Sequence, residues 1–303
     1  MGVVEAAIVP KVGVLGATSM VGACLLPLLT QTDFQVTAYS RRMMVDQAGN
    51  GVAWRQLPTS GLPSHLFSLA GEDVKIPLWI CVAPIWVLPD YFALLEAHGA
   101  RRVVALSSTS RFTKNESSDL EEQTMACCLA ESEARVQSWA ENIGVEWVIL
   151  RPTLIYGLGR DKNIVEIARF IRRFGFFPLF GRAGGLRQPI HSQDVATACI
   201  TAITLPAVVN RAYNISGGET LAYRDMVIRV FVAIDLTPRL LSLPLLVFRV
   251  AITLLRCLPR YRHWSVAMAE RMNRDLVFED SEAVRDLAFK ARSFELSPGD
   301  VCF

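Results

Sequence analysis

The chain has 303 residues, of which 51% are hydrophobic and 20% are charged, and its formal net charge is +2 at pH 7. This composition predicts a folded protein with a large core and excludes an intrinsically disordered chain. The near-neutral balance gives no reason to expect a nucleic-acid partner. The first residues show no basic stretch followed by a long apolar run, so we expect no secretory signal and a cytoplasmic protein.

The seven cysteines include no Cys-x-x-Cys pair and no zinc-binding spacing. Their odd number does not suit a complete disulfide framework. We therefore interpret them as small core residues in a reducing compartment, and we predict no metal site.

Strand-like and helix-like segments alternate along the first two thirds of the chain. Short apolar runs predict strands at Val12–Leu15, Val36–Ser40, Leu78–Val82, Arg102–Ser107 and Val145–Leu150. Amphipathic patterns predict helices between several of them, at Met20–Leu29, Leu88–Ala97 and Leu120–Asn142. This alternation is typical of an α/β fold with a doubly wound parallel sheet covered on both faces, whose ligands bind at the carboxyl ends of the strands.

The pattern changes after about Phe176, where a stretch rich in Gly, Pro and Arg predicts loops with short strands. A helix at Ser192–Thr204 and a strand at Ala212–Ile215 are expected to return to the sheet, and helices dominate from Ser216 onward. We therefore expect one domain of residues 1–175 with 191–215. Residues 176–190 and 216–303 would form a smaller, mainly helical lobe that binds the substrate.

The segment "KVGVLGATSMVG" (11–22) places a glycine-spaced turn between the first strand and the first helix. Gly16 permits the tight turn, and Gly22 lets the helix pack close to the strand. Ser19 holds the middle position, where its hydroxyl can donate to a phosphate oxygen, and the helix beginning near Met20 directs free N–H groups at the same anion. The pattern predicts a Rossmann-type dinucleotide-binding turn, with a purely structural tight turn as the alternative.

The end of the second predicted strand discriminates between the two nicotinamide dinucleotides. An NAD-binding protein usually carries Asp or Glu there, to bind the ribose 2′-hydroxyl. This strand ends instead in Ser40, Arg41 and Arg42. Two guanidinium groups suit a 2′-phosphate, so we predict NADP rather than NAD, the alternative being a solvated surface pair.

Five segments resemble, in the right order, the NAD-dependent epimerase/dehydratase family of extended short-chain dehydrogenases. They are "GATSMVG" (16–22), "VVALSSTS" (103–110), "WVILRPTLIYGLGR" (147–160), "RQPIHSQDVATACITAI" (187–203) and "AYNISGGETLAYRDM" (212–226). The resemblance implies a Rossmann domain with a small substrate lobe and, in many members, a nucleotide-sugar substrate. It also implies pairing of two chains through the helices at Leu88–Ala97 and Leu120–Asn142, so we expect a homodimer.

Carried onto this sequence, the resemblance implies roles for individual residues. Those lining the pyrophosphate would be Gly16, Thr18, Ser19, Met20 and Gly22. Ala83 and Pro84 would lie along the cofactor, and Pro152 and Thr153 beside the nicotinamide. Ser108 would be the active-site hydroxyl, and Arg187 and His191 would face the substrate.

The family's Tyr-x-x-x-Lys pair, in which the lysine lowers the pKa of the proton-carrying tyrosine, is missing. None of the six tyrosines has a lysine four residues further on. The expected positions hold Met125 and Leu129, or Gln123 and Cys127 in the other register. Two substitutes remain: Tyr156 activated by Arg160, or His191. As alternatives, Tyr156 packs in the core and His191 only hydrogen-bonds to the backbone.

Two hypotheses for the function follow. The first is an NADP-dependent oxidoreductase or isomerase with a non-standard proton donor, acting on a nucleotide-sugar-like or other small carbonyl or hydroxyl substrate. The second is a non-catalytic NADPH-binding accessory or redox-sensing protein. The apolar, arginine-containing segment 243–264 bears on this choice, since it fits core packing, peripheral contact with a membrane surface, or the lining of an anionic substrate pocket.

Overall fold

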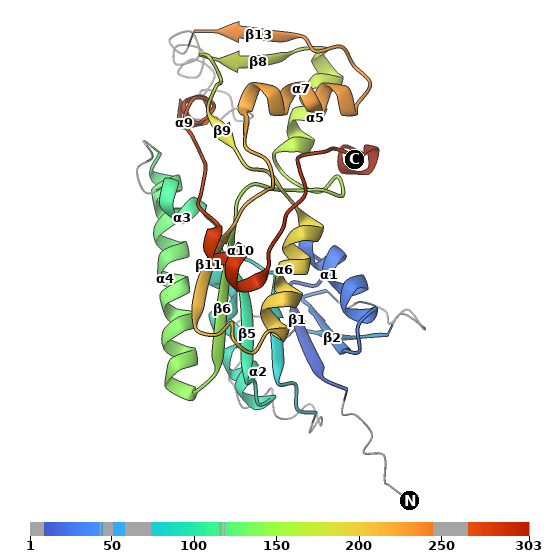
Figure 1. Ribbon diagram of the computed structural model, residues 1–303, viewed down its shortest axis with the longest axis vertical. Helices are drawn as coiled ribbons and strands as arrows, with labels where there is room; N and C mark the ends of the chain where they lie inside the picture. Colours follow the sequence, from blue (N-terminus) through green and yellow to red (C-terminus); the bar gives the residue numbers. More distant parts are fainter. Residues whose placement is uncertain are drawn as a thin grey trace, which may run out of the picture. The chain divides into compact units, whose positions relative to one another are not determined.

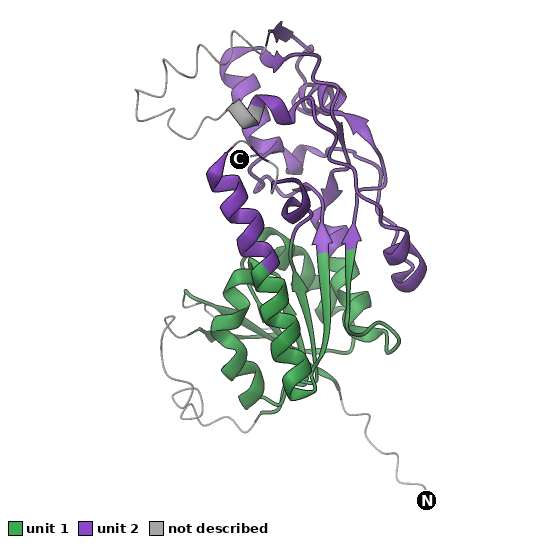
Figure 2. Ribbon diagram, turned by 90° about the vertical axis from the view of Figure 1, so that its left-hand side faces the viewer, with its two compact units in different colours: residues 1–107, 131–150, 196–213 green, residues 108–130, 151–195, 214–303 purple. Residues whose placement is uncertain are grey.

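The computed structural model describes residues 9–42, 44, 51–57, 74–114, 117, 119–244 and 266–302. Its internal contacts divide the chain into two compact units, coloured green and purple in Figure 2. Unit 1 comprises Met1–Ser107, Glu131–Leu150 and Ala196–Tyr213. Unit 2 comprises Ser108–Ala130, Arg151–Val195 and Asn214–Phe303.

A seven-stranded sheet with the order β11-β6-β5-β4-β1-β2-β3 forms the centre of unit 1. The strands are β1 (Lys11–Leu15), β2 (Gln35–Ser40), β3 (Val52–Gln56), β4 (Leu78–Cys81), β5 (Arg102–Leu106), β6 (Glu146–Pro152) and β11 (Arg211–Ile215). The ladders from β3 through β6 are parallel. The strand order reverses beside β1, which confirms the predicted doubly wound sheet and places a topological switch point there.

Helices cover both faces of this sheet (Figures 1 and 2). On one face lie α1 (Met20–Thr30) and α6 (Ser192–Thr204), and on the other α2 (Phe92–Ala97) and α4 (Leu120–Ile143). The rings of Phe92 and Trp139 stack at 4.2 Å between α2 and α4. Because both faces are covered, the central strands are apolar throughout, and all five residues of β5 are buried.

Two elements of unit 1 differ from the sequence-based expectation. The predicted helix Leu88–Ala97 is a 3-10 segment, η3 (Ile85–Tyr91), followed by the short helix α2. Pro89 lies inside η3 and has no N–H to donate to an α-helical hydrogen bond. The edge strand β3 was not predicted, because its residues are only partly buried and show no clean alternation.

Unit 2 contains short helices and three two-stranded sheets. The helices are α3 (Ser110–Thr113), α5 (Ile164–Phe174), α7 (Tyr223–Ala233), α9 (Val266–Arg271), α10 (Ser281–Leu287) and the 3-10 segment η5 (Pro298–Asp300). The strand pairs are β7 (Ile155–Tyr156) with β10 (Ile190–His191), β9 (Leu186–Arg187) with β12 (Leu221–Ala222), and β8 (Phe177–Phe180) with β13 (Leu240–Leu243). The described part of unit 2 is thus mainly helical and also contains short two-stranded sheets.

The units divide the chain at other positions than the expected boundary at residue 175. Residues 108–130 and 151–175 belong to unit 2. The reason is the core of unit 2, in which the apolar face of α5 packs against α7. Fully buried Ile164 and Ile171 of α5 share this core with Val227 and Phe231 of α7.

The carboxylate of Asp300 links three segments of unit 2. It accepts hydrogen bonds from the backbone N–H of Leu158, from both the N–H and the hydroxyl of Ser297, and from Nε2 of His191. Burial opposes ionisation of this carboxyl, but the donors from His191 and Ser297 outweigh it and hold its pKa well below the ordinary value. Asp300 therefore ties the C-terminal segment to the loop after β7 and to β10.

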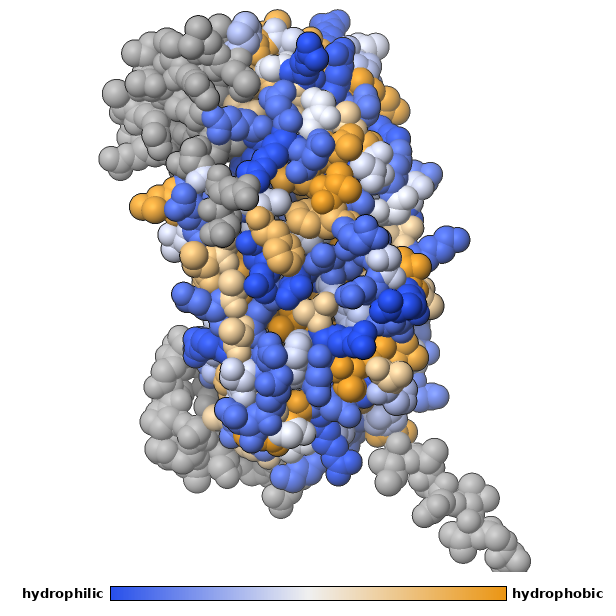
Figure 3. Space-filling view, turned by 60° about the vertical axis from the view of Figure 1, so that its left-hand side comes forward, coloured by the Kyte–Doolittle hydropathy of each residue, from blue (hydrophilic) through white to orange (hydrophobic). Residues whose placement is uncertain are grey.

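The described residues include no helix that is long and apolar enough to cross a membrane. Of the apolar segment 243–264, everything from residue 245 on lies outside the described residues. On the face shown in Figure 3, hydrophobic residues occur in separate groups among hydrophilic ones.

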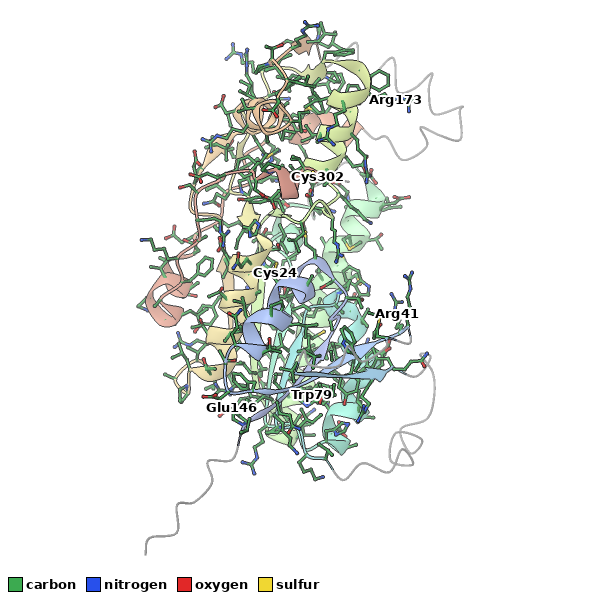
Figure 4. The ribbon with its side chains drawn as sticks, turned by 90° about the vertical axis from the view of Figure 1, so that its right-hand side faces the viewer. Cys24, Arg41, Trp79, Glu146, Arg173 and Cys302 are labelled. Carbon is green, nitrogen blue, oxygen red and sulfur yellow. The ribbon has the colours of Figure 1, made fainter. Side chains whose placement is uncertain are left out.

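We predict that Gly13→Ala destabilises the protein by about 1–3 kcal/mol through overpacking. A Cβ atom at Gly13 would lie 2.6 Å from the fully buried Trp79 ring, which Figure 4 shows within the sheet layer. The measurement is the urea unfolding midpoint. The control is Gly184→Ala, where no atom lies within 4 Å of the added Cβ. Equal midpoints for the two variants would contradict the close packing of β1 on β4.

We predict that Asp300→Asn lowers the free energy of unfolding by about 2 kcal/mol at neutral pH, because charge-assisted hydrogen bonds are lost. Since the pKa of Asp300 is depressed in the folded state, its stabilisation is complete above the unfolded-state pKa of about 4. It is lost as the pH falls toward the folded-state pKa. Urea unfolding at several pH values should show a gap to the wild type that narrows in acid.

The matched control for this experiment is Asp235→Asn, which replaces an exposed carboxylate of unit 2. We expect it to change stability by less than about 0.5 kcal/mol at every pH. A gap for Asp300→Asn that stays constant from neutral to acid pH would show that the charge of this carboxylate is not what stabilises the fold.

Candidate functional site

The glycine turn after β1 is fixed by close approach of the backbone. Gly16 has φ +79°, and a Cβ atom there would lie 2.4 Å from the backbone N of Ala83. A Cβ atom at Gly22 would lie 2.4 Å from the carbonyl oxygen of Ala17. The first and third positions of the predicted pattern therefore need glycine for steric reasons.

Ser19 is the N-cap of α1. Its Oγ accepts a hydrogen bond of 3.0 Å from the N–H of Gly22, and its own N–H donates to the carbonyl of Gly16 at 2.9 Å. The hydroxyl proton is not used in the first of these bonds, so it is available to a phosphate oxygen. The first turn of α1 holds no acidic residue. With Thr18 exposed and Met20 partly exposed, the turn fits an anionic group at the helix N-terminus.

Three carboxyl strand ends meet around this turn within unit 1. β1 lies between β2 and β4, with Leu15 paired to Tyr39 and to Cys81. The residues that follow are therefore neighbours: the turn itself, Ser40–Arg42 after β2, and Ala83–Pro84 after β4. The structure thus brings together the expected pyrophosphate, ribose and cofactor-side residues of unit 1.

The end of β2 carries two exposed guanidinium groups and no carboxylate. Ser40 is buried, and its Oγ accepts a hydrogen bond of 3.2 Å from the N–H of Arg42. Arg41 and Arg42 are exposed, and Figure 4 shows Arg41 at the margin of the sheet. Within the part of the chain that the structure describes, neither guanidinium forms an ion pair, so both are accessible to an anionic ligand.

A pocket of about 460 Å³ lies entirely within unit 2. Its polar and charged lining residues are Thr109, Ser110, Thr113, Lys114, Ser117, Glu122, Thr153, Asn163, Arg187, Gln188, Tyr223, Glu270, Arg271 and Arg274. Two of the expected site residues line it: Thr153, expected beside the nicotinamide, and Arg187, expected to face the substrate. Pro152 lies just outside, where its carbonyl accepts a hydrogen bond of 3.1 Å from the N–H of Thr109.

Arg187 is a buried cation in the wall of this pocket, with 4% of its surface exposed. Its guanidinium donates to the backbone carbonyls of Leu186 at 2.7 Å, of Arg274 at 2.8 Å and of Arg271. It also lies over the Tyr223 ring, 5.4 Å from the centroid. Burial lowers its pKa, because water no longer stabilises the charge. No carboxylate among the described residues forms an ion pair with it at contact distance.

Ser108 follows β5 and is partly buried. Its Oγ accepts a hydrogen bond of 3.1 Å from the N–H of Ser110. The neighbouring Ser107 donates its hydroxyl to the buried carboxylate of Glu133 at 2.5 Å. Ser108 is not among the pocket-lining residues, although Thr109 and Ser110 beside it are.

Tyr156 has the environment of a packing residue. It is fully buried, its ring packs edge-on against His191 and Phe294, and its hydroxyl donates to the carbonyl of Glu295 at 3.3 Å. Burial raises its pKa to about 12, aided by the negative charge of Asp300. The cation acting on Tyr156 is Arg292 rather than the expected Arg160. The phenol is therefore not activated for proton transfer.

Both ring nitrogens of His191 are engaged in the fold. Nδ1 accepts a hydrogen bond of 3.1 Å from the N–H of Gln193, and Nε2 lies 3.4 Å from Oδ1 of Asp300. This arrangement assigns the proton to Nε2, which donates to the carboxylate. His191 thus hydrogen-bonds both to the backbone of Gln193 and to the side chain of Asp300.

Sequence reasoning missed three charged residues of the pocket: Lys114, Glu122 and Arg271. Glu122, near the start of α4, forms an ion pair with Arg271 at the end of α9 and accepts a 2.7 Å hydrogen bond from Ser117. The pKa of Lys114 is lowered by burial and by the charge of Arg271. One signal was present in the sequence, because residues 239–274 contain seven arginines and one glutamate, but no spacing joins these arginines to α4.

Comparison with known proteins finds a partial family match and a shared fold. Residues 91–216 match the model of the NAD dependent epimerase/dehydratase family. A UDP-glucose 4-epimerase of Vibrio cholerae is 24% identical over 122 residues, 40% of this chain and 37% of that protein. An uncharacterized protein of Sinorhizobium fredii is 27% identical over 157 residues, 49% of this chain and 39% of that protein. The chain thus matches less than half the length of these curated relatives.

Solved structures match over nearly the whole chain. The UDP-glucose 4-epimerase of Thermotoga maritima, with UDP-glucose, superposes with a TM-score of 0.67 at 14% identity, covering 96% of both chains. The UDP-glucuronic acid 4-epimerase of Bacillus cereus, in complex with NAD, gives 0.65 at 15% identity, covering 96% of this chain and 95% of the other. At this identity the likeness concerns the fold.

The family match begins at residue 91 and so does not include the glycine turn, which rests on the fold and on its own geometry. The match includes the serine-rich end of β5 and the segment around Arg187 and His191. Over residues 91–216 the chain is similar to the NAD dependent epimerase/dehydratase family, and it shares the fold of solved nucleotide-sugar epimerases.

Proposed function

We propose that the protein is an NADP-dependent oxidoreductase or isomerase that acts on a nucleotide-sugar-like substrate with a non-standard proton donor. The observation that carries this proposal is the turn Gly16–Gly22 together with Arg41 and Arg42, at adjacent carboxyl strand ends of unit 1. The nicotinamide, when bound, supplies hydride transfer.

The roles of the residues in unit 1 follow from their geometry. The N–H groups at the start of α1 and the hydroxyl of Ser19 bind the pyrophosphate. Arg41 and Arg42 bind the 2′-phosphate, since the end of β2 lacks the carboxylate that would accept from a ribose hydroxyl. The Bacillus cereus epimerase was solved in complex with NAD, so that relative does not support a preference for NADP. We propose this preference for the present chain because of Arg41 and Arg42.

Arg187 supports a phosphate-bearing substrate. A buried guanidinium that hydrogen-bonds only to carbonyl oxygens keeps a net positive charge in the pocket wall. A bound substrate diphosphate neutralises that charge. The Thermotoga maritima relative was solved with UDP-glucose, a compound of this class.

We assign the proton-handling hydroxyl to Ser108. Tyr156 keeps its proton because of its raised pKa, and both nitrogens of His191 are engaged by Gln193 and Asp300. Ser108 accepts one hydrogen bond through Oγ, which leaves its O–H free to donate to a substrate oxygen. Of the three catalytic candidates, Ser108 is therefore the one that remains available.

The second candidate function is a non-catalytic NADPH-binding protein. The observation in its favour concerns Tyr156 and His191, the two substitutes for the missing Tyr-x-x-x-Lys pair. Both form hydrogen bonds inside unit 2, to Glu295 in one case and to Gln193 and Asp300 in the other. Binding of NADPH without turnover of any sugar nucleotide distinguishes this function from the first.

We predict that the double variant Arg41→Ala, Arg42→Ala binds NADPH about tenfold to a hundredfold more weakly, while NADH affinity changes less than about threefold. Fluorescence titration measures both. The control is Arg172→Ala, Arg173→Ala, which removes two exposed arginines from α5 in unit 2. Equal losses for NADPH and NADH would refute the 2′-phosphate assignment, and failure of the wild type to bind either would refute the proposed function.

We predict that Ser108→Ala lowers kcat by about a hundredfold, because a positioned proton donor contributes roughly that factor. The assay incubates the protein with NADPH or NADP and a panel of UDP-sugars, and follows reduced cofactor by absorbance and the sugar by NMR. Ser138→Ala, on the exposed side of α4, is the control. A wild type that binds NADPH but converts no sugar nucleotide supports the second candidate instead.

A further inference from the structure

Three phenylalanine rings form a cluster at the C-terminal end of α5 in unit 2. The centroid of the Phe170 ring lies 4.6 Å from that of Phe174 and 5.9 Å from that of Phe176. The Phe174 and Phe176 centroids are 6.4 Å apart. Phe174 is 52% exposed, and the other two rings are partly exposed. These three residues are called the aromatic cluster below.

The way in which α5 ends brings these rings to the surface. Ile167 and Ile171, on the apolar face of the helix, are already buried in the core of unit 2. The helix ends at Gly175, which has φ +75° and donates its N–H to the carbonyl of Ile171 at 2.8 Å. A Cβ atom added at Gly175 would have no atom within 4 Å, so the space beside the helix end is open. Contiguous apolar groups in such a position are typical of an interaction surface.

Two arginine side chains accompany the aromatic cluster. The guanidinium of Arg173 lies 5.3 Å from the centroid of the Phe174 ring, and Figure 4 shows Arg173 at the outer edge of the ribbon. Arg239 is exposed, and its carbonyl accepts a 2.9 Å hydrogen bond from the N–H of Phe177, the residue that follows the cluster. In the part of the chain that the structure describes, neither guanidinium takes part in an ion pair.

The two segments that carry these arginines have an excess of positive charge. Glu166 is the one carboxylate of α5, and it pairs with Arg169 at 2.6 Å. The last turn of the helix adds two further arginines. The segment 234–239, which leads into β13, contains Asp235 and Arg239. Four arginines against two carboxylates give a net charge of +2, which complements an anionic surface.

A membrane surface that contains anionic lipid complements both properties at once. Because Arg173 lies over the Phe174 ring, whatever covers this ring also contacts a cation. Lipid headgroups offer phosphate oxygens to guanidinium groups, and aromatic rings are favoured at the boundary with the hydrocarbon. Leu241 of β13, two residues after Arg239, is 47% exposed and adds a further apolar side chain. A protein partner would have to remove water from the arginines in order to cover the rings, which is costly unless each arginine is paired.

We propose that the aromatic cluster docks unit 2 on a bilayer that contains anionic phospholipid. The rings of Phe174 and Phe176 enter the headgroup region, and Arg173 and Arg239 contact lipid phosphates. This inference is independent of the proposed catalytic function. It concerns residues 170–177 and 239–241, which lie outside the segment 243–264. Such docking is peripheral and reversible, because two rings and a few arginines bury little area.

The test is co-sedimentation of the full chain with two kinds of vesicle, one of phosphatidylcholine alone and one that also contains about 30% phosphatidylserine. We expect the partition coefficient to be about tenfold higher for the vesicles with phosphatidylserine, since each arginine near an anionic surface contributes roughly fivefold. About 0.5 M salt should remove most of this preference by screening.

The double variant Phe174→Ser, Phe176→Ser should lower the partition coefficient for the phosphatidylserine vesicles about tenfold or more, because the rings no longer enter the bilayer. The double variant Arg173→Ala, Arg239→Ala should reduce the preference for phosphatidylserine to about threefold or less. If the two-serine variant does not fold, as judged by its urea unfolding midpoint, Phe174→Ser alone takes its place at a half-exposed ring.

The matched controls are Val284→Ser, at an exposed apolar residue of α10, and the double variant Arg135→Ala, Arg224→Ala, at exposed arginines of α4 and α7. Both should keep the wild-type partition coefficient within about twofold. A wild type that sediments with neither kind of vesicle overturns the proposal, and so does binding that survives the loss of the rings. Sedimentation velocity without vesicles tests a protein contact. Self-association that the serine variant abolishes, with no vesicle binding, would assign this surface to a second copy of the chain and overturn the membrane proposal.

Discussion

The Trp79 ring lies over Gly13 of the central strand β1, and the backbone of Ala83 lies against Gly16, so neither glycine has room for a side chain. An added Cβ would meet the Trp79 ring at 2.6 Å in one case and the backbone of Ala83 at 2.4 Å in the other. At Gly16 the chain leaves the sheet at positive φ, and Ser19, three residues further on, is the N-cap of α1. The anion site at the helix N-terminus is therefore a consequence of strand packing at the switch point of the sheet.

The sequence predicted the parts of the fold whose signals are local. β1, β5 and β6 are short runs of buried apolar residues, and α1 begins at a serine N-cap, so a few neighbouring residues specify each. β3 escaped prediction because an edge strand with partly exposed side chains has no distinctive period. The division into units was also not predictable from local patterns, since it depends on α5 packing against α7, which lies far along the chain.

The same distinction separates the two halves of the candidate site. The glycine turn and the arginines after β2 are contiguous in sequence, and their geometry agrees with what their spacing predicts. Lys114, Glu122 and Arg271 come from three separate segments, so no spacing joined them before the structure did. For His191, the residue type indicated proton transfer, but its partner Asp300 lies 109 residues away, and that contact makes it part of the fold.

Burial has different consequences for the ionisable groups of unit 2, and those differences separate structural residues from ligand-binding ones. Tyr156 responds by staying neutral, with a pKa of about 12 and a carbonyl acceptor for its proton. Asp300 stays charged because donors from His191, Ser297 and Leu158 surround it. Arg187 donates to backbone carbonyls and lies over the Tyr223 ring, and Asp275 acts on it only as a more distant charge. Since folding has already removed water from this cation, an anion entering the pocket gains more from it than from a solvated arginine.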